Sequence, residues 1–544
     1  MDVKASLIAI ANAISTDLKR SRQIPPPDMI ERLLQSLPGV ELILVDLLIS
    51  EGQKAKPRAQ ILEVLAEMLF VAVETLRRRI DGRHAEAIAT LGKINDLLRA
   101  RANSRQMRLN EFAQIGQCFA RAKLDPGEDI RELATLLAPP DAPAASKARR
   151  KRGGDASEDV TPEMILGHMA AVAHSFGDDP FATFAQIDEM VSAFPQDAKA
   201  MFCGVLATAA QVAVGEAALG FLLDRSETVW QAVLVGLATA LANGHVSQAS
   251  AQRLVLMRNW LPAARQPQFD NFLKNVRLAT AAQKQPLPRR SVLAPESLFM
   301  SGCDGAGAQT MLAVCKEGRK FGLASILVKH DFGIRDAFVL HGLRKSELDA
   351  MFEQINTQTA SLPTTTETIA VLIDHGLADN MASGEPPPFG LIEVLETVGY
   401  GMRVPHQITT EALVGQLLAG LPDRRTDARA LKAALQRSGE WHGQDPVVAS
   451  WFEDDDRLVA LLQGQPKTRH ADLILTQFLP LRRSFWAHRL AWTALSLKHG
   501  PDDIDCIDHA LLARELLGTR DLATMPVMTM IAEASAKAYA ANQR

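Results

Sequence analysis

The stretch from Ser301 to Phe338, SGCDGAGAQTMLAVCKEGRKFGLASILVKHDFGIRDAF, comes closest to a recognisable chemical motif. Three glycines open it, but in the order GxxGxG and without the lysine that a phosphate-binding GxxxxGK[ST] loop requires. Cys303 and Cys315 are followed by His330 and His341, a spacing looser than the close ligand pairs of a typical zinc site. Neither a nucleotide loop nor a zinc site is expected, and the glycines are expected to serve turns and close backbone approach.

The same stretch predicts a small α/β insert. Apolar, β-branched runs indicate strands over 297–304, 308–317 and 322–330, the last two joined by a tight turn at Gly318. The segment RKSELDAMFEQI follows as a helix, for which Ser346 is a plausible N-cap.

Acidic residues on this insert suggest a second chemistry. The order of strands and helix resembles the opening of the RNase H-like fold, in which an aspartate on the first strand and a glutamate on the helix hold metal ions. The resemblance covers at most about 75 residues and implies Asp304, Glu347 and, if its segment is a strand, Asp374 as ligands. These carboxylates would hold Mg²⁺ for phosphodiester cleavage. The alternative is that Asp304 belongs to a turn and Glu347 to a solvated helix start.

Two further groups of side chains could bind a ligand. The segment KARRKRGG carries five cations that could bind phosphates without sequence preference, although a solvated linker also explains them. They are Lys147, Arg149, Arg150, Lys151 and Arg152. In SFWAHRLAWTALSLKH, His488 lies between Trp486 and Trp492 and could contact a ligand, although a buried histidine of the core is the more common case.

The elements that position these residues are expected to be mainly helices. Of the 544 residues 47% are hydrophobic but only 5% are aromatic, and the abundant Ala and Leu favour helix over sheet. The length predicts roughly three or four packed units. A net charge of −4 argues against a general nucleic-acid coat, and five scattered cysteines without a CxxC pair suit reduced thiols.

Breaks in the helical pattern divide the chain into five predicted segments. They are an N-terminal helical domain (1–138), a disordered basic linker (139–160), a repeat-like helical domain (161–284), the α/β insert (297–366, with its strands and helix near 297–358) and a C-terminal helical domain (367–544). The alternation of medium helices and short turns resembles HEAT and armadillo α-solenoids, at the level of architecture only. Irregular helical bundles are the alternative.

One apolar run tests whether the chain enters a membrane. Residues 200–223 are long enough to cross a bilayer, but Glu216 interrupts them and alanine supplies much of their apolarity. We expect a buried helix, or two helices broken near Gly215. The N-terminus lacks the basic start and cleavage site of a secretory signal, so a cytoplasmic protein without a membrane partner is expected.

The leading functional hypothesis is a non-enzymatic, cytoplasmic helical scaffold or adaptor that binds a protein partner of unknown identity and needs no cofactor. A Mg²⁺-dependent nuclease or phosphoryl-processing enzyme centred on Asp304 is one alternative. A nucleic-acid-associated protein that uses the 147–152 cluster is the other. The chain carries no HExxH, GxSxG, CxxC or kinase signature, which leaves enzymatic activity an open question.

Overall fold

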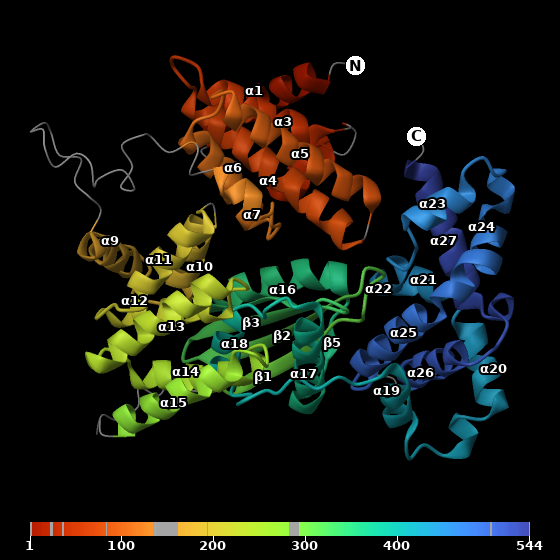
Figure 1. The fold of residues 1–544 in the computed structure, drawn as a ribbon. Coiled ribbons are helices and arrows are strands. Elements are labelled where there is room, and N and C mark those ends of the chain that lie inside the picture. The colour runs from red at the N-terminus through yellow and green to blue at the C-terminus, as the bar shows by residue number, and fades with distance from the viewer. Residues whose placement is uncertain are drawn as a thin grey trace, which may run out of the picture. The chain divides into compact units, whose positions relative to one another are not determined.

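The computed structural model describes residues 3–542 with gaps at 22–24, 35, 36, 38, 83, 134–136, 138–160, 193, 282–292, 501 and 502. The chain forms two compact units, an N-terminal unit (Met1–Val246) and a C-terminal unit (Ser247–Arg544) (Figure 1). The predicted boundary between domains at 139–160, like the basic cluster at 147–152, lies outside the described residues. The five predicted segments therefore stay a prediction.

The described residues of the N-terminal unit form helices throughout. These are α1 (Val3–Ser21), α2 (Pro27–Leu34), α3 (Val40–Gly52), α4 (Ala59–Asp81), α5 (Ala85–Asn103), α6 (Leu109–Arg121), α7 (Glu128–Arg131), α9 (Pro162–Ser175), α10 (Pro180–Val191), α11 (Gln196–Leu206), α12 (Val212–Ala218), η2 (Leu219–Leu223) and α13 (Glu227–Ala242). The apolar stripe of α4 is buried in a core shared with α1, α3 and α6. Its arginines Arg78 and Arg79 lie in the last turn, where the helix dipole favours cations.

Helix starts in this unit follow the expected chemistry. The hydroxyl of Thr161 accepts a hydrogen bond from the Met164 amide at 3.3 Å, and Pro162 occupies the first turn of α9.

The long apolar run of residues 200–223 is divided between α11, α12 and η2. It breaks at 207–211, where Gln211 caps α12, rather than at Gly215. Among the described residues no helix is both long and apolar enough to cross a membrane.

The C-terminal unit combines a sheet with two sets of helices. The helices up to residue 398 are α14 (Gln248–Met257), η3 (Arg258–Trp260), α15 (Gln266–Ala281), α16 (Lys345–Thr359), α17 (Thr366–Ser383) and α18 (Gly390–Val398). The remaining helices are α19 (Thr410–Leu418), η4 (Asp423–Arg425), α20 (Ala428–Arg437), α21 (Trp441–Gln444), α22 (Pro446–Ala449), α23 (Asp456–Leu462), η5 (Lys467–Arg469), α24 (His470–Leu473), η6 (Ile474–Phe478), η7 (Leu479–Arg482), α25 (Arg483–Leu497), α26 (Asp503–Leu517), η8 (Leu522–Thr524) and α27 (Pro526–Asn542).

The sheet is antiparallel, in the order β4-β3-β2-β1-β5. Its strands are β1 (Pro295–Met300), β2 (Ala308–Glu317), β3 (Lys320–Lys329), β4 (Gly333–Leu343) and β5 (Leu362–Pro363). Gly318, at φ 65°, forms the expected tight turn between β2 and β3. Because β1 ends at Met300, Asp304 lies in the loop before β2 and not on a strand.

Helices cover both faces of this sheet. Leu348 on α16 is buried against Leu312 and Leu323, whereas α17 and α18 contact β3 and β4 on the opposite face (Figure 1). The edge strand β4 is capped by a side chain: Oδ1 of Asn380 accepts from the Ile334 amide at 2.8 Å, and its Nδ2 donates to the Ile334 carbonyl at 3.3 Å. Asn380 thus replaces a neighbouring strand at this position.

The predicted fold class, mainly α with a small α/β insert, is confirmed. Whether the helices form a HEAT-like solenoid stays a prediction. One local expectation was wrong. The N-cap of α16 is Arg344 rather than Ser346, because Glu347 accepts from the Arg344 amide at 2.8 Å. The segment that carries Asp374 is the helix α17, so the condition under which Asp374 would be a third ligand is not met.

Candidate metal centre

Three histidines from three separate elements meet in the C-terminal unit. His330 follows β3 in the turn to β4, and its amide donates to the Gly307 carbonyl at 2.9 Å, which ties the turn to the glycine-rich loop. His375 lies in the middle of α17 and His488 in the first half of α25. The close packing of α17 on the sheet positions His375, since a Cβ on the adjacent Gly376 would lie 2.9 Å from Ile334.

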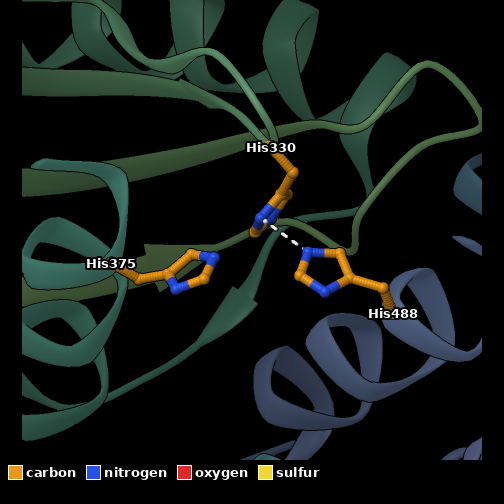
Figure 2. Close-up of side chains that lie close together, drawn as sticks. All are labelled: His330, His375 and His488. Carbon is orange, nitrogen blue, oxygen red and sulfur yellow. Dashed lines mark hydrogen bonds between the residues drawn. The ribbon is translucent and has the colours of Figure 1, made fainter. Parts of the chain in front are cut away.

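The rings converge on a common point (Figure 2). One nitrogen of each ring lies within 4.8 Å of a nitrogen of the other two, and Nδ1 of His330 is 3.2 Å from Nε2 of His488. His330 and His375 are each only 1% exposed. Trp492 packs beside them, its ring centroid 4.8 Å from His330 and 4.6 Å from His375.

The hydrogen bonds fix where the protons lie. Oε1 of Gln309 can only accept, so Nε2 of His330, at 3.1 Å, donates to it. Nδ1 of His330 therefore accepts from Nε2 of His488. Nδ1 of His488 is left to accept from the Thr410 hydroxyl at 3.1 Å. A directed chain of hydrogen bonds thus runs from Thr410 on α19 to Gln309 on β2.

His375 differs from the other two rings. Its Nδ1 accepts from the Ile408 amide at 3.3 Å, so the proton of the neutral ring lies on Nε2. That Nε2 is buried and has no hydrogen-bond partner among the described residues, the nearest carboxylate oxygen being Oδ2 of Asp379 at 3.6 Å. A buried polar atom without a partner costs about 1–3 kcal/mol.

All three rings are held neutral. Burial is the main cause that lowers the pKa of His330, His375 and His488, and the last falls to about 3. The neighbouring charge of Arg489 lowers the pKa of His330 and His488 further. Neutral imidazole is the form that binds transition metals, so the cluster is ready to act as a ligand set at neutral pH.

The geometry approaches what a metal ion requires. A tetrahedral zinc ion with Zn–N bonds of about 2.1 Å places its ligand nitrogens about 3.4 Å apart. The pair His330 and His488 already has this separation, at 3.2 Å, and His375 has to move closer. Gln309 and Thr410 would hold the outward nitrogens of the two rings, the arrangement that usually orients metal-bound histidines.

Metal binding would require two rings to change tautomer. His488 would move its proton to Nδ1, where the Thr410 hydroxyl can accept as well as donate. His375 would move its proton from Nε2 to Nδ1, so that Nε2 binds the ion and the long bond from the Ile408 amide to Nδ1 is lost. The Ile408 amide and the Nδ1–H of His375 would then both lack an acceptor, at a cost of about 1–3 kcal/mol each, which is smaller than the roughly 10 kcal/mol or more that zinc binding supplies in structural sites.

The acids singled out from the sequence lie apart from this cluster. Asp304 is half-buried in the loop, its Oδ1 accepts from the Ala308 amide at 2.7 Å, and desolvation raises its pKa. Glu347 pairs with Arg344 on the surface, which lowers its pKa to about 2. Asp374 lies 3.4 Å from Nε of Arg403. Among the described residues these acids form no group that could share an ion, and Mg²⁺-dependent cleavage stays a prediction.

Four residues had a loose zinc-site spacing in the sequence, namely Cys303, Cys315, His330 and His341. Of these only His330 belongs to the three-histidine cluster. Burial raises the pKa of Cys303 to about 12 and of Cys315 to about 11, so both thiols remain protonated. His341 lies between Glu317 and Glu393, whose hydrogen bonds raise its pKa to about 9. His488 was recognisable from its aromatic neighbours, but no spacing signal links His375 to it.

Comparisons with known proteins give a partial resemblance. Residues 411–540 match the family described as the Y4lR C-terminal helical domain, and residues 195–280 match the Y4lR second domain. The uncharacterized protein y4lR of Sinorhizobium fredii is 28% identical over 382 residues, which cover 70% of this chain and 73% of that protein. No solved structure matches the chain. His488 lies within the first matched segment, whereas His330 and His375 lie outside both.

Proposed function

We propose that the C-terminal unit binds a divalent transition-metal ion through His330, His375 and His488. The observation that carries the proposal is the convergence of three neutral imidazoles, one of which presents a buried nitrogen without a partner. Imidazole ligands favour zinc, copper, nickel or iron, whereas Mg²⁺ and Ca²⁺ prefer oxygen ligands. Zinc is the ion we expect, with three protein ligands and one position left open.

A purely structural histidine cluster is the competing explanation. It accounts for the chain of hydrogen bonds from Thr410 to Gln309, which is complete without a metal. It does not account for Nε2 of His375, which would remain buried and unsatisfied. The metal explanation gives this atom a partner, and we favour it for that reason.

The test is a zinc titration of the full chain after treatment with a chelator. We expect one equivalent to bind in competition with a chromogenic chelator, and Mg²⁺ not to compete. His330→Gln, His375→Gln and His488→Gln should each weaken zinc binding at least tenfold. His442→Gln, which removes an exposed histidine of the same unit, is the matched control and should bind as the unaltered chain does.

Two outcomes would overturn the proposal: no stoichiometric zinc binding, or equal binding by the His375→Gln variant and the unaltered chain. Circular dichroism shows whether each variant is folded. Cobalt(II) provides a second measurement, because its visible absorption reports directly whether nitrogen ligands surround the ion in a tetrahedral arrangement.

The scaffold or adaptor role predicted from the composition stays a prediction, and so does nucleic-acid binding by residues 147–152. Both are separable from the metal proposal. A protein partner captured equally well by the unaltered chain and by His375→Gln would show that partner binding does not depend on the histidine cluster.

A further inference from the structure

Beside the histidine cluster lies a buried cation whose counter-ion, Asp331, is beyond hydrogen-bond distance. The side chain of Arg489 is only 3% exposed, and its Nε has no hydrogen-bond partner among the described residues. The nearest carboxylate oxygen is Oδ2 of Asp331, 4.0 Å from Nη2, which is beyond hydrogen-bond distance. A guanidinium in this position is costly unless an acceptor reaches it.

The fold nevertheless holds this guanidinium in a defined place. The ring of Phe485 lies beneath it, 4.0 Å from Cζ to the ring centroid. Gly307, at φ +83°, lies against it on the loop, and a Cβ there would be 2.4 Å from Nη2. The glycine-rich loop therefore leaves room for the planar fork, and a positioned fork is suited to a bidentate oxyanion.

Neither neighbouring acid removes the need for an anion. The Asp331 side chain is 62% exposed, so solvent screens its charge. Asp304 is half-buried, and its Oδ1 already accepts from the Ala308 amide of the same loop at 2.7 Å. One carboxylate is screened by solvent and beyond hydrogen-bond distance, and the other is bound by the amide of its own loop, so Arg489 is available to a third acid.

Arg489 is also close to the proposed metal ligands. It directly follows His488, and Asp331 directly follows His330. One helical turn further along α25, Nε1 of Trp492 is a second buried donor without a partner in the described part of the chain. Two buried donors without acceptors, Nε of Arg489 and Nε1 of Trp492, thus lie one helical turn apart on α25 beside the cluster.

We infer that Arg489 binds the carboxylate of a small acidic ligand beside the three-histidine centre, and that Asp331 is the exposed counter-ion which this ligand displaces. The inference rests on the proposed function, because the open position of a three-histidine ion is the second anchor for the ligand. One guanidinium that also faces Asp331 suits a singly charged carboxylate better than a phosphate dianion. Asp331 marks the route from solvent, since it is the exposed member of the pair.

Acetate and its neutral counterpart acetamide are the probes, titrated by calorimetry into the zinc-loaded full chain. We expect acetate to bind and acetamide not to bind. Arg489→Met should weaken acetate binding at least tenfold, and Asp331→Asn should strengthen it several-fold because the competing charge is removed. Asn tolerates the left-handed backbone of Asp331, at φ 72°, so this variant should fold normally. Asp349→Asn, an exposed acid of α16, is the matched control.

The outcomes separate this inference from the metal proposal. If zinc binds but acetate affinity is the same in Arg489→Met, Asp331→Asn and the unaltered chain, the inference is wrong and the metal proposal stands. If no zinc binds, acetate is titrated into the metal-free chain. Acetate binding that is lost in Arg489→Met would support the carboxylate subsite without the metal, whereas no acetate binding would show that the inference is wrong. Phosphate that binds more tightly than acetate would contradict the carboxylate class.

Discussion

Nδ1 of His330 lies 3.2 Å from Nε2 of His488, although 158 positions separate the two residues in the sequence. The contact joins the β3–β4 turn to α25, and with it the sheet to the C-terminal helices of the same unit. Its donor and acceptor are fixed by Oε1 of Gln309, which can only accept, and the Thr410 hydroxyl completes the chain at the other end. Several measurable properties depend on this polarity.

The first prediction concerns acid. The pKa of His488 falls to about 3 in the folded protein, against about 6.5 in the unfolded chain. Above pH 6.5 the ring is neutral in both states and has no effect. As the pH falls below 6.5, the unfolded chain takes up a proton that the folded one does not, and stability decreases by about 1.4 kcal/mol per pH unit.

Urea unfolding at pH 7 and pH 5 measures this loss. His488→Gln should lose about 2 kcal/mol less than the unaltered chain between these two values, because it lacks this group. Asp379, whose pKa burial raises, takes up a proton over the acid range and offsets part of the total, so the comparison with the variant isolates the histidine. Equal losses in both proteins would contradict a buried neutral His488.

The second prediction concerns Thr410. Replacing its hydroxyl in Thr410→Val leaves Nδ1 of His488 without a partner. We expect a loss of about 1–3 kcal/mol in the free energy of unfolding and a 10- to 100-fold weaker zinc affinity. Thr410→Ser keeps the hydroxyl and should retain both properties. A Thr410→Val variant with unchanged zinc affinity would show that Thr410 does not orient a ligand.

The third prediction concerns the glycine-rich loop. A Cβ on residue 305 would lie 2.2 Å from the Ser450 carbonyl oxygen, which belongs to the backbone and cannot rotate away. Gly305→Ala should therefore destabilise the protein by about 1–3 kcal/mol or more. Gly443→Ala, on α21 with no atom within 4 Å of the added carbon, should be neutral or slightly stabilising. Thermal unfolding of the two variants distinguishes a tight contact from a general intolerance of alanine.

How far the sequence could predict the fold depended on the range of the interactions. Period-two patterns and a glycine turn are local signals, and β2 was predicted at its observed bounds of 308–317. Thr161 and Pro162 likewise marked the start of α9. For the apolar segment around Asp374 a strand and a helix were both left open, and the structure has a helix that packs against β3 and β4.

Most of the candidate site could not be predicted from the sequence, because it depends on contacts between residues that are far apart in the chain. His375 and His488 are brought together only by tertiary packing, so no spacing rule could pair them. Glu347 was a plausible ligand by analogy, but a capping contact with Arg344 occupies it locally. The prediction that the loop glycines serve close approach agrees with Gly305 and Gly307, where a Cβ would collide with Ser450 and Arg489.

The fourth prediction concerns the edge of the sheet. Asn380→Ala removes the side chain that satisfies both backbone groups of Ile334. We expect a loss of about 2–3 kcal/mol in the free energy of unfolding and faster amide exchange at Ile334. Ser383→Ala, which removes an exposed hydroxyl that donates to Phe332 at 3.3 Å, should change stability by less than about 0.5 kcal/mol. Similar losses in both variants would rule out a special role for Asn380.

The three rings come from positions 330, 375 and 488, and a denatured chain does not hold such distant residues together. An ion that binds the assembled cluster but not the unfolded chain would therefore stabilise the native state. Each tenfold excess of free ion over its dissociation constant would raise the melting point by a further increment, worth about 1.4 kcal/mol. Dialysis against a chelator would remove the ion, and with it this added stability, while the covalent structure of the chain stays the same.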